Sequence, residues 1–172
     1  EGLIPGMDTH TLWMPPAYII LLSGIFQIFP SELLTARLFS SFISIGSMLL
    51  VYRICLLFHF SFKRISLVLF LLATDFLFLK FSHTARMESL CLFFALGAFY
   101  FLLRRDAQPC VSTIDIFLSG ICLSLSFLSH PFGIVHSIPV LFLLYQRNSL
   151  TFKNVILYAF AGLLPIAAWG IY

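Results

Sequence analysis

Apolar runs of near-membrane length dominate this sequence. The hydrocarbon core of a bilayer is about 30 Å thick and a helix rises about 1.5 Å per residue, so roughly 20 apolar residues span it. Six runs reach or approach that length, which predicts an all-α integral membrane bundle of about six transmembrane helices. The runs are Leu33 to Phe58, Ile65 to Phe81, Met87 to Leu103, Ile114 to Ser129, Phe132 to Tyr145 and Val155 to Tyr172.

Composition supports a membrane environment and excludes one class of partner. Of the 172 residues, 60% are hydrophobic and 10% are charged, which lies outside the usual range of soluble domains. The net charge of +3 comes from dispersed Lys and Arg residues that form no basic stripe, so we expect membrane lipids and no nucleic acid as partners. The four cysteines show neither a CxxC pair nor a zinc spacing and are expected to be small buried apolar residues.

A shorter apolar stretch, Ala17 to Phe29, either spans the membrane or lies at its surface. It follows Pro15 and Pro16 and contains Gln27. If it stays on the outer surface, seven of the ten Lys and Arg residues fall in cytoplasmic loops, as the positive-inside rule requires. We therefore predict an interfacial juxtamembrane helix. The seven residues are Arg53, Lys63, Arg64, Arg104, Arg105, Arg147 and Lys153.

This topology predicts a single membrane domain over residues 1–172, with an outer loop and juxtamembrane helix in 1–32 and transmembrane helices in 33–172. The chain starts at Glu1 and stops inside an apolar run, so we expect it to be incomplete at both ends. Several polar segments then share the outer face, where a polar cavity can form. They are residues 1–16, 30–37 and 80–88, the turn at 129–131 and the final residues 165–172.

The stretch FSHTARMESLCLFF, residues 81–94, is the first candidate site. Ionisable side chains are costly near a bilayer and often mark function. Lys80, His83, Arg86 and Glu88 cluster at a predicted outer turn, with Glu88 in the first turn of a helix capped by Thr84. Two residues of spacing would separate Arg86 from Glu88 on a helix, so we expect no simple intrahelical ion pair between them. The alternative is that they anchor the helix end among lipid headgroups.

His130 is the second candidate, in the turn Ser129-His130-Pro131. Pro131 breaks the helix, so the imidazole should project from the outer turn, either as a structural group or as a donor to a phosphate. Asp75 lies about 15 Å into the membrane at helical rise, where we expect an internal hydrogen bond. Asp8 and His10 are expected to be solvated.

Motifs for soluble nucleotides are missing from the sequence. It contains no phosphate-binding glycine loop, no GxSxG, no HExxH and no DxD. We therefore expect no nucleotide cofactor. A site near the lipid plane suits a lipid-linked substrate better.

Five segments resemble, in the same order, the N-terminal half of bacterial polyprenyl-phosphate-sugar-dependent glycosyltransferases. These are membrane enzymes of the GT-C class, related to protein O-mannosyltransferases and to the lipid A aminoarabinose transferase. The resemblance covers nearly the whole chain. The segments are LWMPPAYIILL, TARLFSSFISI, FSHTARMESLCLFFALGAFYFLLRR, FLSGICLSLSFLSHPFGI and GLLPIAAWGIY.

The resemblance implies inverting transfer of a sugar from a polyprenyl phosphate to a hydroxyl of a lipid or glycan acceptor. It places the enzyme in the bacterial inner membrane, with the active site on the non-cytoplasmic face. Glu88 matches the second acidic position of the family and would position the acceptor or a divalent metal, whereas the catalytic base matches an acidic residue upstream of this chain. His130 stands where the aminoarabinose transferase has lysine. Lys80, His83, Arg86 and His130 would bind the donor phosphate.

The metal requirement, the sugar and the acceptor stay open. Two other functions also fit the residues. One is a transporter or lipid flippase in which the same charges line a path across the membrane. The other is a protein that binds polyprenyl phosphate without turning it over.

Overall fold

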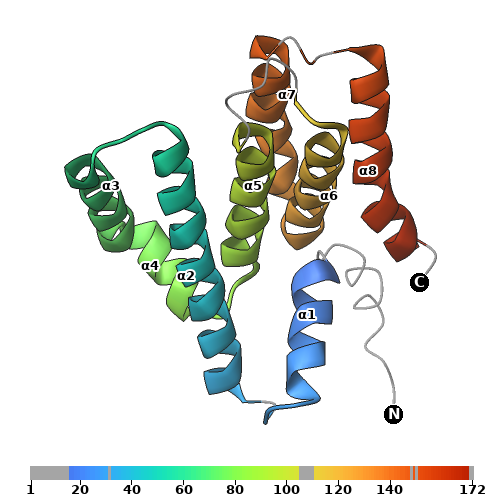
Figure 1. Cartoon of the computed structure of the whole chain (residues 1–172). Helices are drawn as coiled ribbons and strands as arrows, with labels where there is room; N and C mark the ends of the chain where they lie inside the picture. Colours follow the sequence, from blue (N-terminus) through green and yellow to red (C-terminus); the bar gives the residue numbers. More distant parts are fainter. Residues whose placement is uncertain (1–15, 31, 105–110, 148, 150, 171–172) are drawn as a thin grey trace.

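The protein is a bundle of helices (Figure 1), which confirms the predicted all-α class. The computed structural model describes residues 16–30, 32–104, 111–147, 149 and 151–170, and all the regular structure in those ranges is helical. The elements are α1 (Pro16–Phe26), α2 (Leu33–Leu57), α3 (Phe62–Thr74), α4 (Phe76–His83), α5 (Met87–Leu103), α6 (Thr113–Ser129), the 3₁₀ helix η2 (Pro131–His136), α7 (Ser137–Gln146) and α8 (Phe152–Gly170).

An antiparallel pair, α5 and α6, forms the centre of the bundle. Helix α2 packs against α5, and α8 packs against α6 (Figure 1). The main apolar core lies between α5, α6, α7 and α8, because each of these helices buries one face there. Its fully buried members include Ala98, Leu102, Ile116, Val140 and Leu144.

Small side chains let α2 approach α5. Ala36, Ser40 and Ser44 are buried, as their spacing of four residues predicts for a packing face. The Ser44 hydroxyl donates to the Ser40 carbonyl at 2.9 Å, so its burial leaves no open donor. The α2–α5 contact is therefore a close packing of backbones, which brings the start of α5 beside α2.

Two of the predicted runs are not continuous helices. The run from Ile65 to Phe81 breaks at Asp75 with a bend of 61° between α3 and α4. Asp75 ends α3 and caps α4, with its Oδ1 accepting from the Phe78 amide at 2.7 Å. Our expectation of an internal hydrogen bond at Asp75 is confirmed, but the uninterrupted span is wrong. The run from Phe132 likewise begins as the 3₁₀ helix η2 before α7.

Helix length and composition identify one or two candidate membrane crossings in the described ranges. By length and composition α2 is long and apolar enough to cross a bilayer, and the bent α3–α4 pair makes a second span if it counts as one. The other apolar helices in the described ranges have 10–17 residues when α8 is counted over Phe152–Ala168. Helix length therefore supports one or two of the six crossings that the sequence predicts.

The opposite end of the α5–α6 pair holds a buried ion pair. The guanidinium of Arg104, at the end of α5, binds the carboxylate of Asp115, which is fully buried in the first turn of α6. A buried charge is tolerated when it is paired in this way. This pair fixes the two helices at the end remote from Glu88 and His130.

Gly120 permits the contact between α6 and α8, which yields a first prediction. A Cβ at Gly120 would lie 2.7 Å from the Tyr158 carbonyl oxygen and 2.9 Å from the Ala161 Cβ. We expect Gly120→Ala to lower the free energy of unfolding by about 1–3 kcal/mol, because overpacked helices must separate. Thermal unfolding in detergent measures the change.

Gly162 provides the matched control for this test. It faces the same contact, but a Cβ there would meet only the Gly120 carbonyl oxygen, at 3.7 Å. Gly162→Ala should leave stability unchanged or raise it by up to about 1 kcal/mol through helix propensity. Equal effects of the two substitutions would contradict the close α6–α8 contact.

Candidate active site

A cavity of about 500 Å³ lies between α2, the α3–α4 pair, the start of α5, and η2. Its wall is mostly aromatic and aliphatic, but four ionisable side chains from different elements reach it. This combination is typical of small-molecule sites, in which an apolar pocket carries a few polar groups. The four are Asp75, Glu88, His130 and His136.

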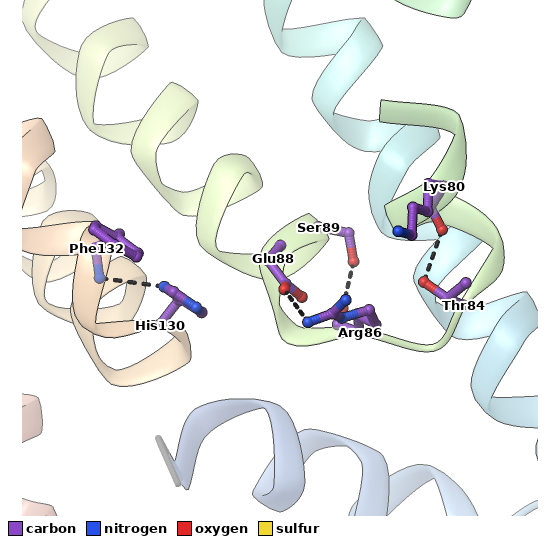
Figure 2. A network of polar contacts seen from close by, with 7 residues as sticks. All are labelled: Lys80, Thr84, Arg86, Glu88, Ser89, His130 and Phe132. Atoms are coloured by element: carbon purple, nitrogen blue, oxygen red, sulfur yellow. Dashed lines mark hydrogen bonds and ion pairs between the residues drawn. The ribbon is translucent and has the colours of Figure 1, made fainter. Parts of the chain in front are cut away.

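Glu88 contributes a carboxylate from the second residue of α5. Its Oε1 lies 2.8 Å from Arg86 Nη2, and its side chain is 18% exposed (Figure 2). Its Oε2 is buried and has no hydrogen-bond partner within the described residues. One carboxylate oxygen is therefore held in place by Arg86, while the other is buried and has no hydrogen-bond partner among the described residues.

One expectation about this helix start is wrong. The N-cap is Arg86, not Thr84, whose Oγ1 donates instead to the Lys80 carbonyl at 2.7 Å (Figure 2). Arg86 and Glu88 do form an ion pair, but it is not the intrahelical pair that their spacing argued against. Helical spacing does not apply, because the Arg86 backbone is extended, with φ −113° and ψ 152°.

His130 contributes an imidazole from the break between α6 and η2. Its Nδ1 accepts from the Phe132 amide at 3.2 Å, and its ring stacks on Phe132 at 5.3 Å between centroids (Figure 2). Because Nδ1 accepts this bond, the proton of the neutral ring lies on Nε2. His130 can therefore donate one hydrogen bond from Nε2 without being a cation.

His136 is a cavity residue that the sequence reasoning missed. It lies inside a run read as a transmembrane helix, but the structure places it at the end of η2, half-buried. Side chains three residues apart align on a 3₁₀ helix. His136 therefore lies on the same face of η2 as Gly133, which packs against α6. Its Nδ1 is buried and has no partner among the described residues.

The other predicted basic residues do not line the cavity. Arg86 contacts two of the lining residues instead: it pairs with Glu88, and its guanidinium lies 5.6 Å from the centroid of the Phe81 ring. Lys80 and His83 are exposed on α4, with the Lys80 ammonium 5.9 Å from the Phe76 centroid. Of the five predicted site residues, Glu88 and His130 thus share the cavity wall, and Arg86 joins them by its ion pair.

Helix α1 docks beside this site at the same end of the bundle (Figure 1). The buried Tyr18 hydroxyl shares a 3.1 Å hydrogen bond with Ser40 Oγ of α2. Burial raises the pKa of Tyr18, the bond to Ser40 lowers it in part, and the negative charge of Glu88 adds to the rise. The negative charge of Glu88 therefore acts on the Tyr18 hydroxyl across the contact between α1 and the bundle.

The described part of the chain brings together no group of three His, Cys, Asp or Glu side chains that could hold a metal ion. Cys55, Cys91 and Cys122 are free thiols. The expectations for Asp8, His10 and Cys110 concern positions outside the described residues.

The fold and the cavity together indicate a class of protein. An apolar helical bundle with a charged pocket at one end suits a membrane protein that binds a ligand with a polar head and an apolar tail. The sequence model of the dolichyl-phosphate-mannose-protein mannosyltransferase family matches residues 14–172. The chain belongs to this family of membrane glycosyltransferases, which use a lipid-phosphate-linked sugar as donor. No curated protein and no solved structure gives a significant match.

Proposed function

We propose that this protein transfers a sugar from a polyprenyl-phosphate donor to a hydroxyl acceptor at the cavity that holds Glu88 and His130. Membership of the family carries the reaction type. One observation supports this location of the active site. The Glu88 carboxylate and the His130 imidazole, 42 residues apart in the sequence, line one mostly apolar cavity. Transfer of radiolabelled mannose from dolichyl phosphate mannose to an extractable glycan, lipid or protein tests the activity.

The reaction we propose is a single displacement with inversion. The acceptor oxygen bonds to the anomeric carbon as the bond from that carbon to the phosphate oxygen breaks, and the electron pair leaves with the lipid phosphate. The acceptor proton passes to a carboxylate base. Glu88 orients the acceptor hydroxyl through Oε2, the carboxylate oxygen without a hydrogen-bond partner among the described residues, since Arg86 holds the other oxygen.

Charge distribution motivates the proposed orientation. Arg53, Lys63, Arg64 and Arg104 lie at the ends of helices remote from the cavity residues Glu88 and His130, as the positive-inside rule requires for an outward-facing site. We therefore propose six crossings and a site on the non-cytoplasmic face of the bacterial inner membrane. Lys80 and His83, exposed near the turn, would meet the headgroup region, with Lys80, His83 and Arg86 steering the donor phosphate.

His130 gives a second prediction, about donor binding. We expect His130→Asn to weaken the affinity for dolichyl phosphate about 10-fold, because Asn still caps η2 but cannot reach as far as Nε2. Lysine reaches further and carries a charge, so His130→Lys should retain most of the affinity. Binding is measured by titration of dolichyl phosphate into the protein in detergent.

Lys153→Ala is the matched control for His130. Lys153 is an exposed cation near the start of α8, at the end of the bundle away from the cavity. The Lys153→Ala variant should bind dolichyl phosphate as the wild-type protein does. If Lys153→Ala weakens binding as much as His130→Asn, general charge attraction explains the binding and His130 has no specific part in it.

One observation favours a carrier as the second candidate. The α3–α4 break places Asp75 at a helix interruption on the cavity wall, and interrupted helices are frequent in transporters. A carrier would move labelled lipid across a proteoliposome membrane without forming a mannosylated product. Product formation without lipid movement supports the transferase, and the reverse result supports the carrier.

A further inference from the structure

We propose that Asp75 and His136 form a second subsite of the cavity, which binds the hydroxyl groups of the donor's sugar. This inference rests on the proposed transferase function and assigns to the sugar two residues outside the predicted phosphate site. The two residues come from separate interruptions of the bundle, the α3–α4 break and the end of η2. Both line the cavity with Glu88 and His130.

Helix lengths separate this pair from the outer turns that carry Glu88 and His130. Asp75 is separated from the α4–α5 turn by the 8 residues of α4, or about 12 Å. His136 follows His130 by the 6 residues of η2, also about 12 Å at the 3₁₀ rise. η2 runs back along α6, since Gly133 lies against Ser126 and Phe127. The cavity therefore has an outer polar level and an inner one.

The chemistry of the inner level suits hydroxyls better than a phosphate. A carboxylate without a paired cation repels a phosphate but accepts hydrogen bonds from hydroxyl groups, and Asp75, unlike Glu88, has no ion pair within the described residues. The Asp75 carboxylate is held in one orientation by its bond to the Phe78 amide. His136 offers a buried Nδ1 that no described residue occupies, and an imidazole can donate or accept. A buried polar atom without a partner is costly unless a ligand or water supplies one.

Aromatic side chains complete a surface for a sugar ring. Phe78, Phe81 and Phe132 line the same cavity and offer apolar faces to the C–H groups of a pyranose. A sugar has both kinds of surface, C–H faces and equatorial hydroxyls. We infer that the donor phosphate lies at the outer level by His130, while the sugar extends inward to Asp75 and His136.

The test compares two lipids that differ only by the sugar. The intact protein in detergent is titrated with dolichyl phosphate mannose and with dolichyl phosphate. We expect Asp75→Asn and His136→Leu each to weaken binding of the mannosylated lipid about 10-fold and to leave binding of dolichyl phosphate within twofold. Asparagine keeps the α4 cap through its Oδ1, so the Asp75 variant should keep its fold.

Controls separate contact from packing. His136→Asn, whose amide reaches the Nδ1 position, should recover most of the affinity for the mannosylated lipid. His59→Asn removes an exposed imidazole at the far end of α2, at φ 54°, which Asn tolerates, and should change neither affinity. Equal losses for both lipids, or no loss for either, would overturn the sugar subsite. If wild type binds neither lipid, the proposed function fails as well.

Discussion

Replacing Glu88 with glutamine is expected to reduce sugar transfer about 100-fold or more, the usual cost of losing a group that orients or deprotonates a reacting hydroxyl. Glutamine has nearly the same shape, so the cavity keeps its volume. Only the negative charge and one acceptor oxygen are lost, and Oε2 is the oxygen without a hydrogen-bond partner among the described residues. Mannose transfer from dolichyl phosphate mannose, measured per mole of purified protein, gives the effect.

The stability of the Glu88→Gln variant should hardly change. The ion pair that it loses joins Glu88 to an Arg86 side chain that is 47% exposed, and such pairs contribute about 0–1 kcal/mol. Glu32→Gln is the matched control, since Glu32 is an exposed carboxylate at the N-cap of α2 that makes no capping bond. Transfer by Glu88→Gln within a few-fold of the Glu32→Gln rate would remove Glu88 from the mechanism.

Glu88→Asp refines this expectation. Aspartate keeps the carboxylate but shortens its reach by one methylene, so we expect an intermediate loss of transfer. A variant with activity like that of Glu88→Gln would show that the position of the carboxylate, as well as its charge, is required.

Local sequence patterns could predict most of the helices. The runs expected at Leu33 to Phe58 and Ile114 to Ser129 correspond to α2 and α6 within one residue at each end, and the run from Met87 to Leu103 coincides with α5. Each of these helices begins and ends where a long apolar stretch meets a polar turn, so the apolar pattern alone predicts its bounds. The shared end of the helices that carry Glu88 and His130 follows from alternating helix directions (Figure 1).

The misses have one physical cause, which is local backbone that leaves α-helical geometry. Asp75 ends one helix and caps the next, although the surrounding hydropathy is continuous. Arg86 is extended, so it reaches Glu88 where a helical pair could not. His136 lies on a 3₁₀ turn within an apolar run, and hydropathy gives no sign of it.

The cavity itself could not be predicted from sequence. Its wall combines residues from α2, α3, α4, α5 and η2, so its existence depends on the angles between these elements. The bend of 61° at Asp75 is one such angle, and no residue pattern fixes its size. The sequence could indicate which polar groups share one end of the bundle, but not which of them face one another.

Gly133 connects the fold to both histidines, and its substitution should have the second largest effect. A Cβ at Gly133 would overlap the backbone of Ser126 and Phe127 in α6, closer than real Cβ atoms lie to any backbone. Because backbone cannot rotate away as a side chain does, η2 must move off α6. We expect Gly133→Ala to lower the free energy of unfolding by about 3 kcal/mol, the upper range for overpacking.

The displacement of η2 should also reduce sugar transfer about 10-fold or more, because His130 and His136 bracket Gly133 at the two ends of η2. Gly24→Ala is the control, since nothing lies within 4 Å of a Cβ there and alanine favours helix α1. Thermal unfolding and mannose transfer are measured on both variants in the same detergent. If Gly133→Ala unfolds and reacts like Gly24→Ala, η2 does not pack on α6 as described, and the two histidines lose the support that places them on one cavity wall.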